Sequence, residues 1–147
     1  MNILLAYDGS EPSQRALQLV LRLSHGMAAT EDVHVTVTFV AESSVPAVYM
    51  PDYIDPGVWS RMEEGIRQAG RDVLAEAERM FTGADVEVET TLLSGQPAEA
   101  ITKYAAAHGV DLTIMGSRGL NAVGEMLLGS VSRGVLHRSH CPVTIVR

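Results

Sequence analysis

Short apolar or alternating runs along the chain predict five β-strands. Two of these runs, 3–7 and 111–116, are almost continuously apolar, which is typical of strands covered on both faces. The run 85–92 alternates strictly and places acids on one face, which indicates a half-exposed edge strand. The five predicted strands are 3–7, 33–40, 85–92, 111–116 and 142–146.

Apolar residues that recur every three or four positions predict a helix between each pair of strands. Ser10 is suited to cap the first helix, and Pro97 fits the first helical position of the third, since its missing N–H would have no partner there. The predicted helices lie at about 10–26, 60–81 and 97–109, and from 129 onward.

The second predicted helix carries an apolar stripe with heptad-like spacing. We expect this stripe to face the core and not to form a coiled coil, because it is short. The segment before it, 43–59, contains three prolines and Trp59, and predicts a long loop. Such a loop serves as a lid or an interface, or it is a tolerated insertion packed by its own aromatic residues. The stripe consists of Met62, Ile66, Ala69, Val73, Ala77 and Met80.

The strict alternation of strands and helices predicts an α/β fold with an open five-stranded parallel sheet and helices on both faces. The most uniformly apolar strands, the first and fourth, should be central, and the third and fifth should lie at the edges. Strand order 3-2-1-4-5 satisfies this. In such a sheet, a ligand binds beyond the carboxyl ends of strands 1 and 4, where the winding reverses.

Length and composition fit one domain spanning 1–147. The chain has 147 residues, of which 46% are hydrophobic, and its single cysteine, Cys141, has no partner for an internal disulfide. The net charge of −7 and the single lysine disfavour nucleic acid as a partner. Because the first residues lack a basic segment and no apolar run approaches 18 residues, we expect a cytoplasmic protein with no membrane partner.

The segment after the fourth strand carries the main candidate chemistry. Its pattern is G-x2-G-x9-G-S, formed by Gly116, Gly119, Gly129 and Ser130. The first two glycines allow the backbone to turn and approach an anion, and the last pair opens a helix whose free N–H groups attract phosphate. The hydroxyls of Ser130 and Ser132 also suit a di- or triphosphate.

Other known site patterns are excluded. The pattern is not a P-loop, because no lysine stands before Ser130, and it is not a dinucleotide fingerprint, because only Gly9 follows the first strand. No Ser-His-Asp arrangement and no receiver-domain lysine can be assigned. His137, His140 and Cys141 have a spacing compatible with metal ligands, but a structural role is favoured because histidines suit a helix end. We therefore predict no catalytic residues and no protein metal site.

The chain resembles the universal stress protein family over essentially its whole length. The resemblance rests on the opening strand that ends in Tyr7-Asp8-Gly9-Ser10-Glu11, on the complete glycine motif, on the phrase 111–119, and on the ending 141–146. It implies a Rossmann-like fold of the adenine nucleotide alpha hydrolase-like type, a homodimer, and membership of the ATP-binding branch.

The resemblance also implies roles for individual residues. Asp8 would meet the ribose or the adenine edge, and the backbone at Val40 would bond the adenine. An Asx turn that ends the first strand is the alternative reading of Asp8. Arg118 either touches a phosphate or is a solvated loop cation. The residues expected around the phosphates are Gly116, Arg118, Gly119, Gly129, Ser130, Val131 and Ser132.

The leading hypothesis is a regulatory homodimer that binds ATP or a related adenine nucleotide with Mg²⁺ or Mn²⁺ and acts as a stress-response sensor. The apolar final strand, 143–146, motivates self-association, since an unprotected apolar edge invites pairing. Two alternatives stay open. One is a slow ATP hydrolase or phosphotransferase, for which Glu125 is the best candidate base. The other is an interaction module that binds no nucleotide. The protein partner cannot be predicted.

Overall fold

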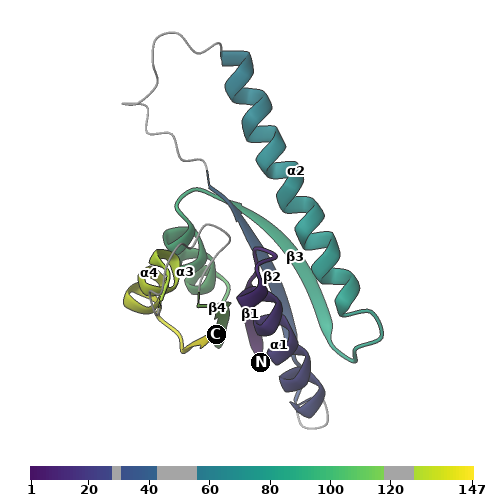
Figure 1. Ribbon diagram of the computed structural model, residues 1–147. Coiled ribbons are helices and arrows are strands. Elements are labelled where there is room, and N and C mark those ends of the chain that lie inside the picture. The colour runs from purple at the N-terminus through teal and green to yellow at the C-terminus, as the bar shows by residue number, and fades with distance from the viewer. Residues whose placement is uncertain (28–30, 43–55, 118–127) are drawn as a thin grey trace.

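A computed structural model describes residues 1–27, 31–42, 56–117 and 128–147 of the chain. Strands and helices alternate along these ranges, as the hydrophobic pattern predicts (Figure 1). The elements are β1 (Asn2–Ala6), α1 (Glu11–Met27), β2 (His34–Ala41), α2 (Pro56–Met80), β3 (Glu87–Ser94), α3 (Pro97–Ala107), β4 (Leu112–Gly116), α4 (Ser130–Arg138) and β5 (Val143–Val146).

The five strands form one sheet in the order β3-β2-β1-β4-β5, and every pairing is parallel. This confirms the predicted fold class and strand order. The two central strands are the apolar ones: Ile3, Leu4 and Leu5 of β1 are at most 1% exposed. β3 is half-exposed at one edge, as its alternation predicts.

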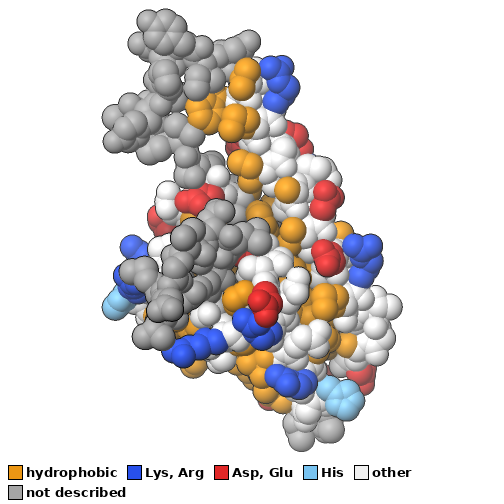
Figure 2. All heavy atoms as spheres, viewed as in Figure 1, with side chains coloured by type: hydrophobic (Ala, Val, Ile, Leu, Met, Phe, Trp, Pro, Cys, Tyr) orange, Lys and Arg blue, Asp and Glu red, His pale blue; other side chains and the backbone are white. Residues whose placement is uncertain are grey.

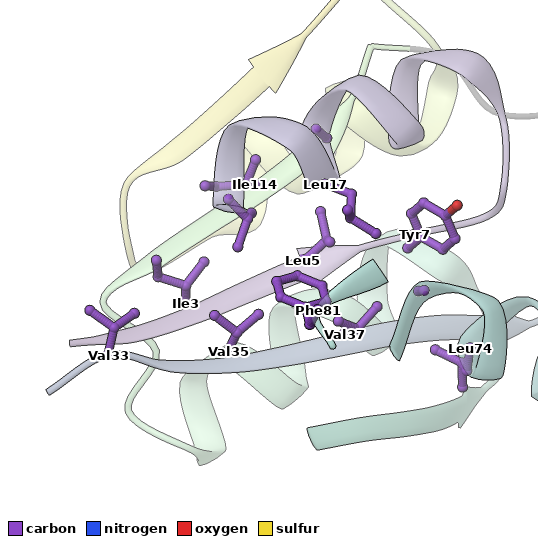
Figure 3. Packing of buried hydrophobic residues seen from close by; sticks show 13 residues of the cluster. Ile3, Leu5, Tyr7, Leu17, Val33, Val35, Val37, Leu74, Phe81 and Ile114 are labelled. Carbon is purple, nitrogen blue, oxygen red and sulfur yellow. The ribbon is translucent and has the colours of Figure 1, made fainter. Parts of the chain in front are cut away.

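Helices cover both faces of the sheet, with α1 and α2 on one side and α3 and α4 on the other (Figure 1). Figure 3 shows the larger core cluster, in which Leu17 of α1 and Leu74 of α2 meet Ile3, Leu5 and Val37 of the sheet. The smaller cluster on the opposite face includes Leu4, Ile101, Met115 and Val135. Alternate residues of each strand therefore supply two separate cores.

The second helix differs from its prediction in two ways. α2 begins at Pro56, not at Ser60, so Trp59 is part of a helix and not of a loop. Pro56 suits the first helical position, a signal that was present in the sequence. The stripe was also expected to face the core along its whole length. In the structure, Val73 and Ala77 do face the core, whereas Met62, Ile66 and Met80 at the two ends of the stripe are exposed.

Candidate functional site

The carboxyl ends of β1, β2 and β4 lie side by side at one edge of the sheet. Ala6 is in register with Thr38 of β2 on one side and with Met115 of β4 on the other. Asp8, Val40 and Ser117 each lie two residues after one of these three paired residues. The structure therefore brings the end of β2, the turn after β1 and the end of β4 together at the predicted crevice.

β2 extends beyond β1 and exposes backbone at this edge. The β1–β2 pairing ends at Ala6 and Thr38, whereas β2 continues beside β3 to Ala41. The carbonyl of Thr38 accepts a bond of 2.8 Å from the N–H of Tyr7, on the β1 side. Because backbone groups of alternate residues point to the same side of a strand, the N–H and C=O of Val40 also point toward β1, past its end.

Asp8 forms a tight turn between β1 and α1. One of its carboxylate oxygens, Oδ1, accepts bonds from the N–H of Ser10 at 3.1 Å and from the hydroxyl of Ser10 at 2.6 Å. The Asx turn considered as the alternative is therefore present. A carboxylate has two oxygens with about four acceptor positions in all. Gly9 completes the turn with a φ of +80°, a conformation that glycine adopts without strain.

The start of α4 is fastened to the end of β4. The N–H of Gly129 donates to the carbonyl of Ser117 at 2.8 Å. The hydroxyl of Ser132 lies 3.1 Å from the carbonyl oxygen of Gly116 and 3.0 Å from that of Ser117. Ser132 is only 2% exposed, so its hydroxyl, expected to meet phosphate, instead holds the first turn of the helix against the strand.

This arrangement leaves backbone donors available at the edge of the sheet. The first N–H groups of a helix have no acceptor within the helix. Gly129 takes an extended conformation before α4 and provides no side-chain cap. Within the described ranges, the N–H groups of Ser130, Val131 and Ser132 have no hydrogen-bond acceptor. Three donors at the positive end of a nine-residue helix form a site suited to an anion.

Gly116 has a role that differs from the expected one. A Cβ atom at this position would lie 2.8 Å from the backbone nitrogen of Ser13 and 2.9 Å from the carbonyl carbon of Pro12. The absent side chain thus lets the first turn of α1 pack directly on the end of β4. This contact places the start of α1 next to the start of α4.

Tyr7, the residue before Asp8, is 2% exposed, and its hydroxyl has no hydrogen-bond partner among the residues that the structure describes. Burial raises the pKa of this phenol above its usual value, and the nearby carboxylates of Glu76 and Asp8 add to the effect. Figure 3 shows Tyr7 at the end of β1 in the larger core cluster. The phenol is therefore neutral at physiological pH and adds no charge to the edge.

Some predicted site residues lie outside the described residues. These are Arg118 and Gly119, together with the candidate base Glu125. Sequence reasoning missed two residues that shape the edge: Ser117, which anchors α4 through its carbonyl, and Ser10, which binds Asp8. Ser10 was recognised only as a helix cap. The role of Ser117 depends on a backbone contact between distant segments, for which a single sequence has no signal.

Two searches of the described residues gave negative results. Across residues 1–27, 31–42, 56–117 and 128–147, no group of three or more His, Cys, Asp or Glu side chains is placed to hold a metal ion. In the same ranges, no helix combines the length and the apolar character needed to cross a bilayer.

Comparison with protein families decides the kinship of the chain. The family model described as "Universal stress protein family" matches residues 1–147. The chain belongs to the universal stress protein family. This confirms the resemblance drawn from the opening turn, the glycine motif and the C-terminal strand.

Universal stress proteins from distant bacteria align with almost the full chain. YxiE of Bacillus subtilis is 35% identical, and the alignment covers 99% of this chain and 97% of that protein. A universal stress protein of Thermus aquaticus is 37% identical, with the same coverage. Among solved structures, universal stress protein UspA from Lactobacillus plantarum superposes with a TM-score of 0.84 at 22% identity, covering 100% of this chain and 97% of that one.

Proposed function

We propose that this universal stress protein binds ATP or a related adenine nucleotide at the carboxyl edge of β1, β2 and β4. The observation that carries the proposal is the set of three N–H groups at the start of α4. They lack acceptors among the described residues, and the helix start that carries them is bonded to the end of β4. Backbone donors and the helix dipole bind phosphate without a lysine. This matters here because the only lysine, Lys103, lies on α3.

The other predicted residues suit the rest of a nucleotide. The backbone of Val40, directed past the end of β1, offers a donor and an acceptor to the edge of an adenine ring. The Asp8 carboxylate, on the neighbouring strand end, is an acceptor of the kind that receives ribose hydroxyls. Arg118 and Gly119 stay in the proposal on the strength of the glycine motif alone.

Solved proteins of the same fold support the nucleotide class. A universal stress protein structure contains cAMP, an Arabidopsis thaliana family member contains AMP, and an Archaeoglobus fulgidus universal stress protein contains dAMP. Their TM-scores to this chain are 0.63, 0.68 and 0.66, at identities of 24%, 20% and 17%.

A divalent cation, Mg²⁺ or Mn²⁺, would accompany a triphosphate. Since the described residues contain no three-ligand cluster, the phosphates and water would supply most of its ligands. The Asp8 carboxylate is the acid of the edge that suits such a cation. When bound, the ion would neutralise phosphate charge.

The test of nucleotide binding has two parts. Freshly purified protein is denatured and any released nucleotide is identified by mass, and stripped protein is titrated calorimetrically with ATP and magnesium. We expect a co-purified adenine nucleotide, or binding near micromolar Kd, about −8 kcal/mol. Empty protein with no heat change would favour the nucleotide-free interaction module. Steady phosphate release above about one turnover per second would instead indicate an enzyme.

In the proposed role, nucleotide occupancy changes the protein's state in the stress response. A ligand present at a hundredfold excess over its Kd stabilises the folded state by about 2.7 kcal/mol through mass action. Such a shift allows occupied and empty forms to differ in their affinity for a protein partner.

We also propose a homodimer through the outer edge of β5. This strand pairs with β4 on one side, and all four of its residues are half-buried. The carbonyls of Pro142 and Val146 bond to β4, so the backbone groups of Val143 and Ile145 point outward. An edge with outward donors and apolar side chains is a template for pairing with a second copy.

The strand contact is tested with Val143→Pro, which removes one outward N–H and leaves the bonds to β4 intact. Val143→Ala is the matched control, because it shortens the side chain and keeps the N–H. Sedimentation should show dimers for the wild type and the alanine variant, and monomers for the proline variant. A folded proline variant with the mass of a dimer would refute the strand contact.

A further inference from the structure

The N-terminal half of α2 carries an apolar surface that no described part of the chain covers. Val58, Met62 and Ile66 follow one another at intervals of four residues and are 38%, 54% and 41% exposed. We call these three residues the α2 stripe. Figure 2 shows hydrophobic side chains gathered at this end of the helix.

The α2 stripe lies N-terminal to the part of the helix that packs on the sheet. The buried positions of α2 are Gly70, Leu74 and Ala77, all in its C-terminal half. At 3.6 residues per turn, Met62 points about a quarter turn away from these residues, whereas Ile66 points in nearly the same direction as Ala77. The N-terminal turns also project past the ends of β2 and β3 (Figure 1). The sheet therefore does not account for the apolar character of the stripe.

The charges near the α2 stripe limit the kind of partner that can bind there. Between residues 56 and 70, Arg61 and Arg67 balance Glu63 and Glu64, in a chain whose net charge is −7. Arg67 pairs with Glu63 at 3.3 Å, and Glu64 pairs with Arg71. This neutral surface has no excess charge for a strongly acidic or basic partner. Two copies of the chain repel each other through their net negative charge. This repulsion is weaker where the two neutral surfaces face each other.

Bulky and small residues lie side by side on this face. Gly65 and Ala69 lie on the same side of the helix as Met62 and Ile66, since residues three and four apart are neighbours on a helix. A Cβ atom at Gly65 would have no atom within 4 Å, so the space in front of it is open. When two such helices run antiparallel, the bulky side chains of one copy lie over the small residues of the other.

We propose that the α2 stripe is a self-association surface on which α2 of one chain packs against α2 of a second copy. The contact is independent of the nucleotide site and of the β5 edge. A stable interface buries about 800 Å² on each partner, and a single helix segment provides less. The association is therefore weak and depends on protein concentration.

The test compares two double variants that add the same charge to the same helix. Met62→Glu with Ile66→Glu places carboxylates on the stripe. Gln68→Glu with Ala75→Glu, the control, places them on the opposite, solvent-facing side, where both residues are exposed. All four positions are exposed, so both variants should retain the circular dichroism and melting temperature of the wild type.

Sedimentation is measured up to about 1 mM protein, where an affinity of about −4 kcal/mol is detectable. We expect the average mass of the wild type and the control to rise with protein concentration above that of the stripe variant. This rise is expected whether or not the β5 dimer forms, because the β5 edge is the same in all three proteins. A wild-type mass independent of concentration, or equal masses for the two double variants, would overturn the proposal. Nucleotide affinity should be equal in all three proteins.

Discussion

The sheet has an amino edge, where its strands begin, and a carboxyl edge, where they end. The two edges differ in how their polar groups are bonded. At the amino edge, a hollow of about 240 Å³ lies among residues of β1, β2, β3 and the end of α3. Its side chains bind one another: His34 pairs with Glu87 at 2.8 Å, and Glu89 accepts bonds from Thr36 at 2.8 Å and from Tyr104 at 3.3 Å. At the carboxyl edge, the side chain of Ser132 bonds to backbone carbonyls at the end of β4. The first backbone N–H groups of α4 have no acceptor among the described residues.

This difference shows what makes one edge a binding site. In a parallel sheet, helix N-termini gather at the carboxyl ends of the strands, and their first N–H groups have no acceptor within the helix. Ser132 and Gly129 hold these donors in place, so a ligand meets a preformed site. At the amino edge a ligand would have to displace bonds that already exist. The predictions below change one edge at a time, beginning with the largest effect.

Gly116→Ala should destabilise the fold by about 1–3 kcal/mol, because the new methyl group would overlap the backbone of α1 at Pro12 and Ser13. Urea denaturation measures the change. Gly65→Ala is the control, because its methyl group enters open space in a helix. It should raise the free energy of unfolding by about 0.5–1 kcal/mol. Equal effects of the two substitutions would show that the contact between β4 and α1 is not tight.

Ser132→Ala removes the hydroxyl that ties α4 to the carbonyls of Gly116 and Ser117. We expect a loss of about 1 kcal/mol in unfolding free energy, together with a several-fold increase in the Kd for ATP, since the donors lose their support. Denaturation and calorimetry on the same protein measure both effects. Unchanged values for both would mean that Ser132 does not position the helix.

Tyr7→Phe tests the buried phenol beside Asp8. Its hydroxyl has no partner within the described part of the chain, so the variant should match the wild type at pH 7 or gain up to about 1 kcal/mol. Because burial raises the pKa of the folded-state phenol above 10.0, ionisation above that pH disfavours the folded state, and stability falls as the pH rises further. Stability measured between pH 7 and 11 should fall less steeply in the variant. Parallel curves would contradict the pKa assignment.

Glu89→Gln, at the amino edge, should have the smallest effect. The amide oxygen keeps an acceptor for Thr36 and Tyr104, and the position is exposed, so stability should change by less than about 0.5 kcal/mol. ATP affinity should equal that of the wild type. A loss of nucleotide binding here would erase the distinction between the two edges.

The sequence supports the architecture better than it supports the details of the site. Continuous apolar runs in β1 and β4 identify the central strands, and alternation in β3 identifies an edge, because each pattern directly reflects which faces are buried. Asp8 and the start of α4 were located because a parallel sheet determines where strand ends meet.

The features that the sequence did not predict concern contacts between distant segments. The hydroxyl of Ser132 was assigned to phosphate, yet it bonds to backbone at the end of β4. Gly116 was explained by approach to an anion, whereas the structure shows α1 in the space of its missing side chain. Met62 and Ile66 were placed in the core because periodicity shows that a face is apolar and does not show what lies opposite it.

The most direct test of the central claim is Ser130→Pro. Proline fits the first helical position, and the extended conformation of Gly129, with φ of −69° and ψ of 164°, is one that a residue before proline adopts. The substitution therefore removes one N–H and keeps the helix. Ser130→Ala, which keeps the N–H and removes the hydroxyl, is the control.

The quantity to measure is the Kd for ATP with magnesium on stripped, folded protein. A bond to a charged group contributes about 1.5–3 kcal/mol, so we expect the proline variant to bind at least about tenfold more weakly than the alanine variant. The alanine variant should be close to the wild type. Equal affinity of the two folded variants would contradict the claim that backbone donors of α4 bind the phosphates.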